Sequence, residues 1–515
     1  MLVALLTVLF LQSGDPSRWL TYSGDDSGQR HSPLTQITPA NAAQLGAVWT
    51  FQTGVLGKWE SSPLVMDGVI YATGPDNHAW AIDAKSGRML WRYRRELPLG
   101  NLSVCCGAVN RGLAVYKTTL LMVTLDAHLV ALDMKTGRPV YDVVIDDFKK
   151  GYTGTAAPLV VKDKVIVGIA GAEFGVRGFL DAFDAETGKK AWRFWTVPLP
   201  GEPGGETWLN DSAQHGGGPT WITGSYDPDL NLIYWGTGNP SPLYLGSVRT
   251  GDNLFTNSLL ALDADTGKRV WSYQFTPHDT HDWDSNHVPV LADMPFNGAR
   301  RKVVMVANRN GFFYVLDRTN GTLLLAKEFV KQTWAKEIGA DGRPVVLPNT
   351  EPTPQGTLTC PDLFGATNYM SPSFNPALGL FFVTARETCG TYFNRPQEFV
   401  EGQRYEAGFM RRTGLDPGYG ALRAIDPVTG EQKWEFRTAR PSLAGTLSTA
   451  SGLVFSGDMD GNVFAVDATT GQRVWNYQTG AAIYAAPITY TVDGIQYVLL
   501  GSGTTLTAYA LRSGI

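Results

Sequence analysis

Residues 465–475 read A-V-D-A-T-T-G-Q-R-V-W, and this string recurs along the chain. The shared pattern is apolar-x-Asp-x-x-(Thr/Ser)-Gly-x-x-x-Trp, and further copies end at Trp91, Trp192, Trp271 and Trp434. A strand that ends at the Asp, a tight turn at the Gly and a new strand at the Trp explain each copy. The chain is therefore expected to be a repeat protein made of strands.

Two copies end at Tyr141 and Leu325 instead of Trp, and Trp49 supplies an eighth anchor because V-W-T-F-Q-T-G matches V-W-N-Y-Q-T-G at Trp475. Alternating runs before the anchors give about four strands per unit, which must stack radially to bury both sheet faces. The pattern predicts an all-β, eight-bladed β-propeller with tryptophan-docking repeats, with seven blades as the alternative. The strand of Trp49 should complete a blade with the C-terminal strands, residues 483–510, so that the N- and C-terminal strands close one blade and leave no open edge.

One spacing is too long for a single bare blade, because 109 residues separate Leu325 from Trp434. We expect an insertion at about 331–414 in a single propeller domain, residues 18–515. The motif tryptophans are interpreted as packing between blades and as carrying no chemistry.

The composition narrows the class of protein. The 515 residues contain 43 Lys and Arg against 48 Asp and Glu, a formal charge of −5, which argues against nucleic-acid binding. A hydrophobic content of 43% excludes intrinsic disorder. Residues 1–11 are continuously apolar, too short to span a bilayer, and are similar to the core of a secretory signal without its basic start or cleavage motif. Residues 1–17 are therefore expected to be a signal peptide or its remnant, with a frayed apolar tail as the alternative, and the protein is expected to be exported.

Four cysteines occur, two of them adjacent. A bond between Cys105 and Cys106 would need a distorted peptide, since neighbouring Cα atoms lie about 3.8 Å apart; two free thiols are the alternative. Cys360 and Cys389 lie inside the expected insertion, and two disulfides fit an exported chain. The chain has no C-x-x-C-H motif for covalent haem.

Residues 276–287, T-P-H-D-T-H-D-W-D-S-N-H, concentrate histidine and aspartate. Imidazole with carboxylate suits zinc, whereas Asp282 and Asp284 on one face of an extended segment suit a hard cation. A solvated polar loop is the third interpretation. Further oxygen donors stand in glycine-rich breaks, Glu173 in A-G-A-E-F-G and Asn239 in G-T-G-N-P.

Taken together, the motifs K-W-E-S-S-P, C-C-G-A-V-N-R-G, G-A-E-F-G-V-R-G, H-G-G-G-P-T-W, G-T-G-N-P-S-P, T-P-H-D-T-H-D-W-D and N-R-N-G-F-F-Y-V-L-D-R follow one another over nearly the whole chain. In this order they resemble the pyrroloquinoline-quinone (PQQ)-dependent alcohol dehydrogenases, the family of quinoprotein methanol and ethanol dehydrogenases. That family has an eight-bladed propeller fold, in agreement with the repeat count.

The resemblance implies where the quinone binds. The disulfide Cys105–Cys106 should cover one face of the quinone and Trp221 the other, because an indole plane suits a flat aromatic cofactor. Arg111 should pair with a cofactor carboxylate, and Arg309 should reach the quinone oxygens. Further positions matching cofactor contacts are Glu60, Thr155, Gly171, Ala172, Thr220 and Asn368.

The resemblance also implies a metal site formed by Glu173, Asn239 and Asp282, with Asp282 as the general base that takes the alcohol proton. A second aspartate at Asp284 resembles the lanthanide-dependent members, since a third carboxylate favours a trivalent ion and adds repulsion around a divalent one. We therefore expect one lanthanide ion, with calcium as the alternative, and structural roles for the histidines.

The implied reaction is the oxidation of primary alcohols to aldehydes in the periplasm, with electrons passing to a separate soluble c-type cytochrome. Leu243, where the methanol enzymes usually have Trp, predicts a wider pocket and a broader range of primary alcohols. A homodimer is kept as a candidate assembly. The competing interpretations are a non-catalytic propeller scaffold, which would have no use for Cys105–Cys106 or Trp221, and a quinoprotein sugar dehydrogenase, expected to lack the adjacent disulfide.

Overall fold

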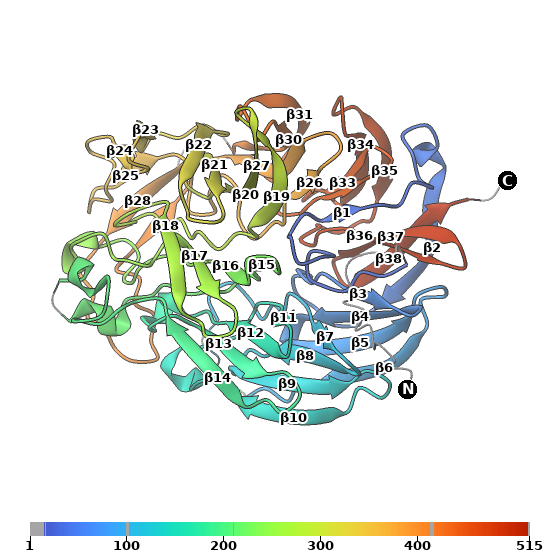
Figure 1. Cartoon of the computed structure of the whole chain (residues 1–515), viewed down its shortest axis with the longest axis horizontal. Helices are drawn as coiled ribbons and strands as arrows, with labels where there is room; N and C mark the ends of the chain where they lie inside the picture. Colours follow the sequence, from blue (N-terminus) through green and yellow to red (C-terminus); the bar gives the residue numbers. More distant parts are fainter. Residues whose placement is uncertain are drawn as a thin grey trace, which may run out of the picture.

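A computed structural model describes residues 15, 17–98, 102, 104–209, 211–412 and 417–512. The expected leader, residues 1–17, lies almost wholly outside the described residues. In the described part the chain is nearly all β, and eight of its sheets have four or five strands. These sheets are arranged in a ring and follow one another in sequence order (Figure 1).

The first five sheets are each built from four consecutive strands. Their bounds are β3 (Leu64–Met66), β4 (Val69–Gly74), β5 (His78–Asp83) and β6 (Met89–Arg94); β7 (Ala114–Tyr116), β8 (Thr119–Val123), β9 (His128–Asp133) and β10 (Pro139–Val144); β11 (Leu159–Val161), β12 (Lys164–Gly168), β13 (Phe179–Asp184) and β14 (Lys190–Trp195); β15 (Ser225–Asp227), β16 (Leu232–Gly236), β17 (Ser258–Asp263) and β18 (Arg269–Gln274); β19 (Val290–Phe296), β20 (Ala299–Ala307), β21 (Phe312–Asp317) and β22 (Leu323–Glu328).

The last three large sheets include strands that are distant in sequence. Their bounds are β26 (Ser373–Asn375), β27 (Leu380–Glu387), β30 (Tyr419–Ile425) and β31 (Gln432–Thr438); β1 (His31–Ser32), β32 (Leu447–Thr449), β33 (Leu453–Gly457), β34 (Asn462–Asp467) and β35 (Arg473–Gln478); β2 (Leu45–Gln52), β36 (Ile488–Val492), β37 (Ile495–Ser502) and β38 (Thr505–Leu511). Since β2 pairs with β38, the strand of Trp49 joins the C-terminal strands in one sheet and closes the ring, as the sequence predicted.

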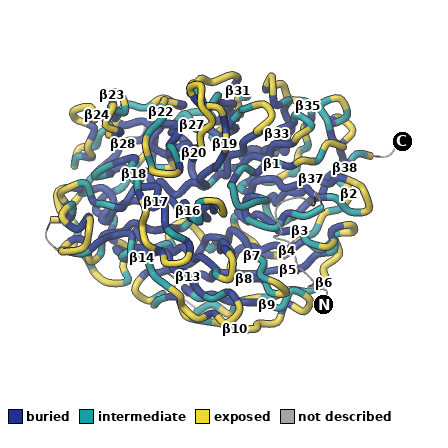
Figure 2. Tube along the Cα trace, viewed as in Figure 1, coloured by how far each residue is buried: buried dark blue, intermediate teal, exposed yellow. Residues whose placement is uncertain are grey.

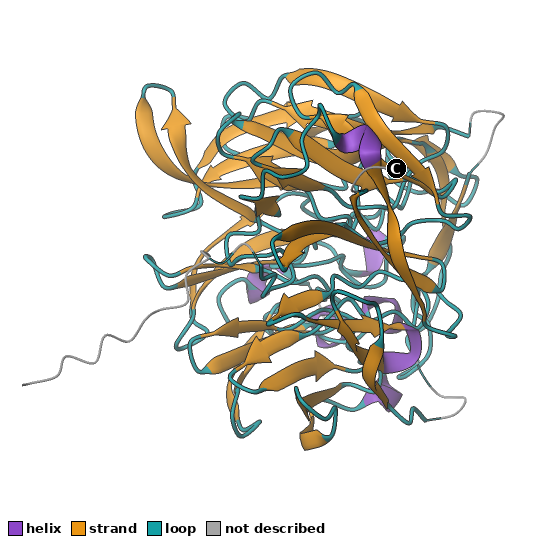
Figure 3. Ribbon diagram, turned by 90° about the vertical axis from the view of Figure 1, so that its right-hand side faces the viewer, coloured by secondary structure: helices purple, strands orange, loops and turns teal. Residues whose placement is uncertain are grey.

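Helical structure among the described residues is limited to short 3-10 turns in the loops, as the edge-on view in Figure 3 shows. They are η1 (Ala42–Gln44), η2 (Pro75–Asn77), η3 (Phe148–Lys150), η4 (Ala172–Phe174), η5 (Gly205–Thr207), η6 (Ser212–His215) and η7 (Gly246–Val248). No helix in the described ranges is long and apolar enough to cross a membrane.

The repeated turn has the hydrogen bonds that its sequence predicts. Asp467 Oδ1 accepts the Thr470 backbone N–H at 2.9 Å, and the Gly471 N–H donates to the Asp467 carbonyl at 2.9 Å. Gly471 has a φ of +72°, which glycine adopts without steric cost. A Cβ at Gly471 would lie 2.6 Å from the ring of Trp434, so the glycine lets the anchor of the preceding sheet approach the turn closely.

The same contact recurs around the ring. The indole of Trp434 donates to the Ala468 carbonyl at 2.9 Å, and the indole of Trp475 donates to the Leu45 carbonyl at 3.1 Å. Between these contacts, apolar residues of neighbouring sheets form shared buried clusters, for example Leu64 and Ala81 with Leu120 and Val130. Figure 2 shows the buried strands inside the ring and the exposed turns along its rim. Burial between adjacent sheets is thus the main source of stability.

Residues 331–414 contain more than additional loops. Two small sheets lie there, β23 (Ala335–Ile338) with β24 (Pro344–Val346), and β25 (Thr357–Thr359) with β28 (Gly390–Asn394) and β29 (Gly408–Arg411). Between them lie β26 and β27, which belong to a large sheet. The extra residues therefore occur in two places, before β26 and after β27. This division could not be predicted from the sequence, because the first two strands of a unit carry no motif that would locate them.

Candidate active site

A cavity opens among loops on one face of the ring. The residues that line it come from two kinds of loop. The first kind leads into the first strand of a sheet and carries, for example, Glu60 before β3 and Asp282 before β19. The second kind joins the second and third strands and carries, for example, Arg309 between β20 and β21. Because antiparallel strands alternate in direction, both kinds of loop lie at the same end of a sheet. Residues far apart in sequence therefore converge on one cavity.

Twelve of the predicted site residues line this cavity: Glu60, Cys105, Cys106, Arg111, Thr155, Gly171, Glu173, Trp221, Asp282, Asp284, Arg309 and Asn368. Three others, Ala172, Thr220 and Asn239, are buried beside it without lining it. The Thr220 hydroxyl donates to the Phe179 carbonyl at 2.6 Å, so it is used within the fold.

Other residues that line the cavity were not predicted from the sequence, among them Lys58, Val104, Val109, Thr153, Ala170, Leu363, Phe364, Tyr369 and Leu443. Lys58 stands two residues before Glu60 in K-W-E-S-S-P, and Tyr369 follows Asn368, so their neighbours in sequence could have indicated them. The apolar residues carry no such signal, because any buried position can hold them.

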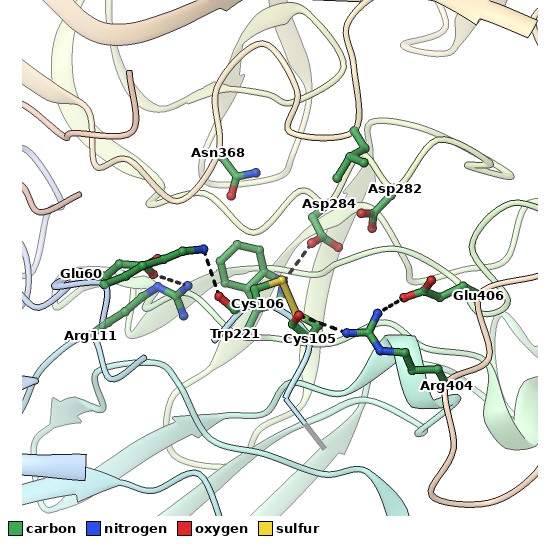
Figure 4. Close-up of a disulfide and its surroundings, with 12 residues drawn as sticks. Glu60, Cys105, Cys106, Arg111, Trp221, Asp282, Asp284, Asn368, Arg404 and Glu406 are labelled. Atoms are coloured by element: carbon green, nitrogen blue, oxygen red, sulfur yellow. Dashed lines mark hydrogen bonds and ion pairs between the residues drawn. A yellow bond between two sulfur atoms is a disulfide. The ribbon is translucent and has the colours of Figure 1, made fainter. Parts of the chain in front are cut away.

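Both predicted disulfides are present. Cys105 and Cys106 are bonded with a Cα–Cα distance of 3.8 Å, and Cys360 and Cys389 with 4.3 Å. The interpretation of Cys105 and Cys106 as free thiols is therefore wrong. The adjacent disulfide and the half-buried Trp221 contribute to the lining of the same cavity (Figure 4).

A buried ion pair forms one wall. Arg111 Nη2 lies 2.7 Å from Glu60 Oε2, and the Arg111 guanidinium stacks 4.8 Å from the Trp221 ring centre and 5.3 Å from that of Tyr369. Arg111 Nε and Nη1 are buried, and no hydrogen-bond partner for either is found among the described residues. A buried donor without a partner is costly, so this guanidinium is suited to an anionic ligand group.

Apart from the Glu60–Arg111 pair, the carboxylates of Glu173, Asp282 and Asp284 line the cavity together with the Arg309 guanidinium. Asp284 Oδ1 accepts the Asn239 backbone N–H at 2.6 Å, and Asp284 Oδ2 accepts the Trp221 indole N–H at 3.0 Å. Arg309 Nη2 lies 3.1 Å from Asp284 Oδ2, while Arg309 Nη1 donates to the Asp282 carbonyl at 2.7 Å. Asp282 Oδ1 and Asn239 Oδ1 are buried, and none of the residues that the structure describes donates a hydrogen bond to them.

Burial and mutual repulsion make these acids hard to ionise without a cation. Burial, followed by the charge of Asp284, raises the pKa of Asp282 well above its ordinary value. Burial, with smaller contributions from Asp284 and Glu406, raises the pKa of Glu173 to about 7. Burial also raises the pKa of Asp284, against the opposing effect of Arg309. Such a group of acids in one cavity is typical of a cation site.

The histidines of residues 276–287 have other partners. His278 and His281 each contact a backbone carbonyl, of Gly251 at 2.8 Å and of Thr350 at 2.9 Å. His287 contacts the Asn368 carbonyl at 3.0 Å and accepts the Arg309 backbone N–H at 3.1 Å. Within the described ranges, one group of three or more His, Cys, Asp or Glu side chains has all its ligand atoms within 4.8 Å of one another, namely Cys105, Cys106 and Glu173. It contains no histidine, and its two cysteines are bonded to each other. The structure therefore does not support the zinc interpretation.

Residues 19–333 and 419–498 match the family described as PQQ, glucose/ethanol/alcohol dehydrogenase, beta-propeller domain. The chain is 40% identical over 542 residues to the quinohemoprotein alcohol dehydrogenase ADH-IIG of Pseudomonas putida, covering 97% of this chain and 75% of that protein.

The chain belongs to the PQQ-dependent alcohol dehydrogenase family. It is also 36% identical over 523 residues to the lanthanide-dependent methanol dehydrogenase of Methylacidiphilum fumariolicum, covering 95% of this chain and 85% of that protein. A solved europium-containing methanol dehydrogenase superposes with a TM-score of 0.92 at 33% identity, over 96% of this chain and 98% of that one. Membership in this family makes the chain an oxidoreductase and sets aside the scaffold interpretation.

The cavity fits the two groups that PQQ-dependent alcohol dehydrogenases bind. Its donors without partners, on Arg111 and Arg309, suit the carboxylates and carbonyls of a quinone. Asp282 Oδ1 and Asn239 Oδ1, which accept no hydrogen bond from the described residues, lie near the carboxylates of Glu173 and Asp284. They suit a hard cation, which prefers oxygen ligands.

Leu243 is 2% exposed and does not line the cavity. It belongs to a buried cluster with Tyr244 and Tyr392, and Leu363, which does line the cavity, packs against this cluster. Any effect of Leu243 on the size of the cavity would therefore pass through the residues packed on it.

Proposed function

We propose that this protein oxidises primary alcohols to aldehydes with PQQ and one lanthanide ion, in the periplasm, and passes the electrons to a soluble c-type cytochrome. The observation that carries this proposal is the convergence of Glu173, Asp282 and Asp284 on the cavity that also contains the disulfide and Trp221. Three carboxylates together favour a trivalent ion, and two relatives are named for lanthanide metals.

In the proposed mechanism, Asp282 takes the hydroxyl proton of the alcohol. Its Oδ1 is buried and free of hydrogen-bond donors, and the Arg309 guanidinium holds its backbone carbonyl at 2.7 Å. A general base must be held at the reacting proton, and this contact fixes the position of its backbone. The bound groups supply the remaining chemistry, hydride acceptance by a quinone carbonyl that the cation polarises.

Arg309 has a second role in this scheme. Asn368 Oδ1 accepts a hydrogen bond from Arg309 Nη2 at 3.2 Å, and this contact helps to hold the guanidinium beside the carboxylate of Asp284. It can therefore donate to an oxygen on which negative charge develops. Arg111, with two donors left free beside Glu60, would anchor the far end of the quinone.

Calcium is the alternative metal, and one contact favours it. Arg309 Nη2 lies 3.1 Å from Asp284 Oδ2, and this ion pair offsets one of the three carboxylate charges. A smaller charge then remains for the cation to balance.

The acceptor, the compartment and the substrate range rest on the sequence. One relative, from Thauera butanivorans, is named 1-butanol dehydrogenase (cytochrome c), which supports a cytochrome as the electron acceptor. Two disulfides and the apolar start of the chain support export. The proposed range of two-carbon and longer primary alcohols rests on Leu243 standing where the methanol enzymes usually have Trp. Leu243 would act on the cavity through Leu363, which packs against its cluster. We also propose that the eight large sheets are the blades of the propeller and that the aromatic anchors dock each blade on the next.

The test is dye-linked oxidation of methanol, ethanol and 1-butanol by apoprotein reconstituted with PQQ and either lanthanum or calcium. Activity with lanthanum alone is the expected result. Activity with calcium alone would retain the alcohol dehydrogenase and reject the lanthanide. Inactivity with both metals, with no quinone absorbance retained, would reject the proposed function.

A further inference from the structure

Three consecutive residues, Arg404, Tyr405 and Glu406, contact three segments of the candidate site at once. They lie between β28 and β29, outside the ranges that match the family, 19–333 and 419–498. We call these three residues the brace.

Each residue of the brace reaches a different part of the site. Arg404 Nη2 donates to the Cys105 carbonyl at 3.1 Å. The Tyr405 N–H donates to the Glu173 carbonyl at 2.7 Å, and the Glu406 carbonyl accepts the Tyr244 N–H at 3.0 Å. The brace thereby joins the disulfide, the turn that carries Glu173 and the loop that follows Asn239.

The brace is itself held firmly. Gln397 Nε2 donates to the Arg404 carbonyl at 2.6 Å, and Gln397 Oε1 accepts the N–H of Ala407 at 2.8 Å. Phe399 stacks on His215 with 4.4 Å between ring centres, and a Cβ on Gly175 would lie 2.7 Å from the Phe399 ring. These contacts give the brace a fixed position against the Glu173 turn.

Of the three contacts, the one to the disulfide depends on a side chain. The Arg404 guanidinium pairs with Glu406 at 2.5 Å and lies 5.8 Å from the ring centre of Phe174, which fixes its direction (Figure 4). On the other cysteine, Lys58 Nζ donates to the Cys106 carbonyl at 3.1 Å. Cys105 and Cys106 are both exposed, so little packing holds them and these two cationic donors fix their carbonyls.

We propose that Arg404, assisted by Lys58, is a positioning residue that holds the Cys105–Cys106 disulfide over the cavity, where it would cover a planar aromatic ligand. This inference rests on the proposed function insofar as the ligand is the quinone. The position of the disulfide itself can be measured in the apoprotein.

The test compares Arg404→Met with Lys58→Met, Arg404→Lys and the control Arg440→Met. Arg440 is also an exposed arginine with an ion pair, to Asp460 at 2.5 Å, and a bond to a backbone carbonyl, of Met459 at 2.8 Å, but it does not line the cavity. Thermal unfolding of all four variants checks that the fold is retained.

The first measurement is the rate at which a phosphine reduces Cys105–Cys106 in the apoprotein, followed by alkylation and mass spectrometry. The bond between Cys360 and Cys389 in the same molecule is the internal reference, since Cys360 is 3% exposed. Arg404→Met should be reduced about threefold to tenfold faster, the effect of one lost hydrogen bond. Lys58→Met should change the rate in the same direction. Arg404→Lys should restore part of the protection, and Arg440→Met should match the wild type.

The second measurement is a titration with PQQ in the presence of lanthanum, read from quinone absorbance. The Kd of Arg404→Met should rise about threefold to tenfold. Wild-type reduction rates in Arg404→Met would overturn the inference. Faster reduction with an unchanged Kd would contradict the role of the disulfide as a cover for the quinone. If the wild type binds no PQQ, the proposed function fails, and the reduction rates alone decide whether Arg404 positions the disulfide.

Discussion

Both carboxylate oxygens of Asp284 accept hydrogen bonds. Oδ1 accepts the backbone N–H of Asn239 at 2.6 Å, and Oδ2 accepts the indole N–H of Trp221 at 3.0 Å. The Trp221 contact links a proposed metal ligand to a proposed cofactor platform. Groups that hold a metal ligand in place fix its orientation, and their mutation typically lowers metal affinity or activity by about 10–100-fold.

Replacing Asp284 with asparagine should remove the charge and keep the shape. We expect Asp284→Asn to lose at least about tenfold in lanthanum-dependent activity, because one of three carboxylates no longer balances a trivalent ion. Steady-state dye-linked assays with each metal measure this. Asp181→Asn is the matched control, since Asp181 is buried and paired with Arg193 but does not line the cavity. Equal loss of lanthanum and calcium activity in Asp284→Asn would contradict a role in metal choice.

Single residues with unusual chemistry could be predicted from the sequence. Asp282, Asp284 and Glu173 stand in breaks of the repeat, and such breaks lie in loops, where the cavity forms. Phe364 and Leu443 could not be predicted, because apolar residues are used throughout the core. Arg404 stands in a segment without a repeat, and its contact with Cys105 depends on tertiary structure.

Among the structural elements, the turn between the last two strands of each sheet determines how neighbouring sheets meet. Gly471 combines a positive φ with a close approach of the Trp434 ring, whereas Gly452 has a φ of +87° and open space where a Cβ would lie. Alanine variants at the two positions therefore distinguish the cost of a strained backbone from the cost of a clash with the Trp434 ring.

Gly452→Ala should lower the free energy of unfolding by about 1–2 kcal/mol, the cost of a left-handed backbone for alanine. Gly471→Ala should cost about 1–3 kcal/mol more, because the new methyl group displaces the Trp434 ring. Equilibrium denaturation in urea measures both values. Equal losses in the two variants would show that the ring contact contributes nothing.

The sequence motif identified the third and fourth strands of each unit, because the Asp, the Gly and the aromatic anchor stand there. It could not locate β26 and β27, which carry no such residues and which lie within the range expected to hold an insertion, about 331–414. Strands recognised only by apolar alternation are difficult to place within a long spacing.

For the whole molecule, closure depends on the N-terminal segment. Arg30 is completely buried and donates to the Tyr22 carbonyl at 2.6 Å, the Pro487 carbonyl at 2.8 Å, the Ser62 hydroxyl at 3.1 Å and the Thr446 carbonyl at 3.2 Å. Its side chain connects the segment before β2 to three sheets from both ends of the chain.

Arg30→Met should lower the free energy of unfolding by at least about 3 kcal/mol, because several buried acceptors lose a charged donor. Arg473→Met, on the exposed face of β35, is the control and should change stability by less than about 0.5 kcal/mol. Urea denaturation followed by tryptophan fluorescence measures both. A loss below about 1 kcal/mol in Arg30→Met would contradict the role of this residue in closure.

The most direct measurement is an anomalous difference map, recorded near a lanthanum absorption edge, from crystals grown with PQQ and lanthanum. The account predicts a peak bounded by the carboxylates of Glu173, Asp282 and Asp284 and by Asn239 Oδ1, with planar density between Cys105–Cys106 and Trp221. A peak elsewhere, or a cavity without planar density, would contradict it.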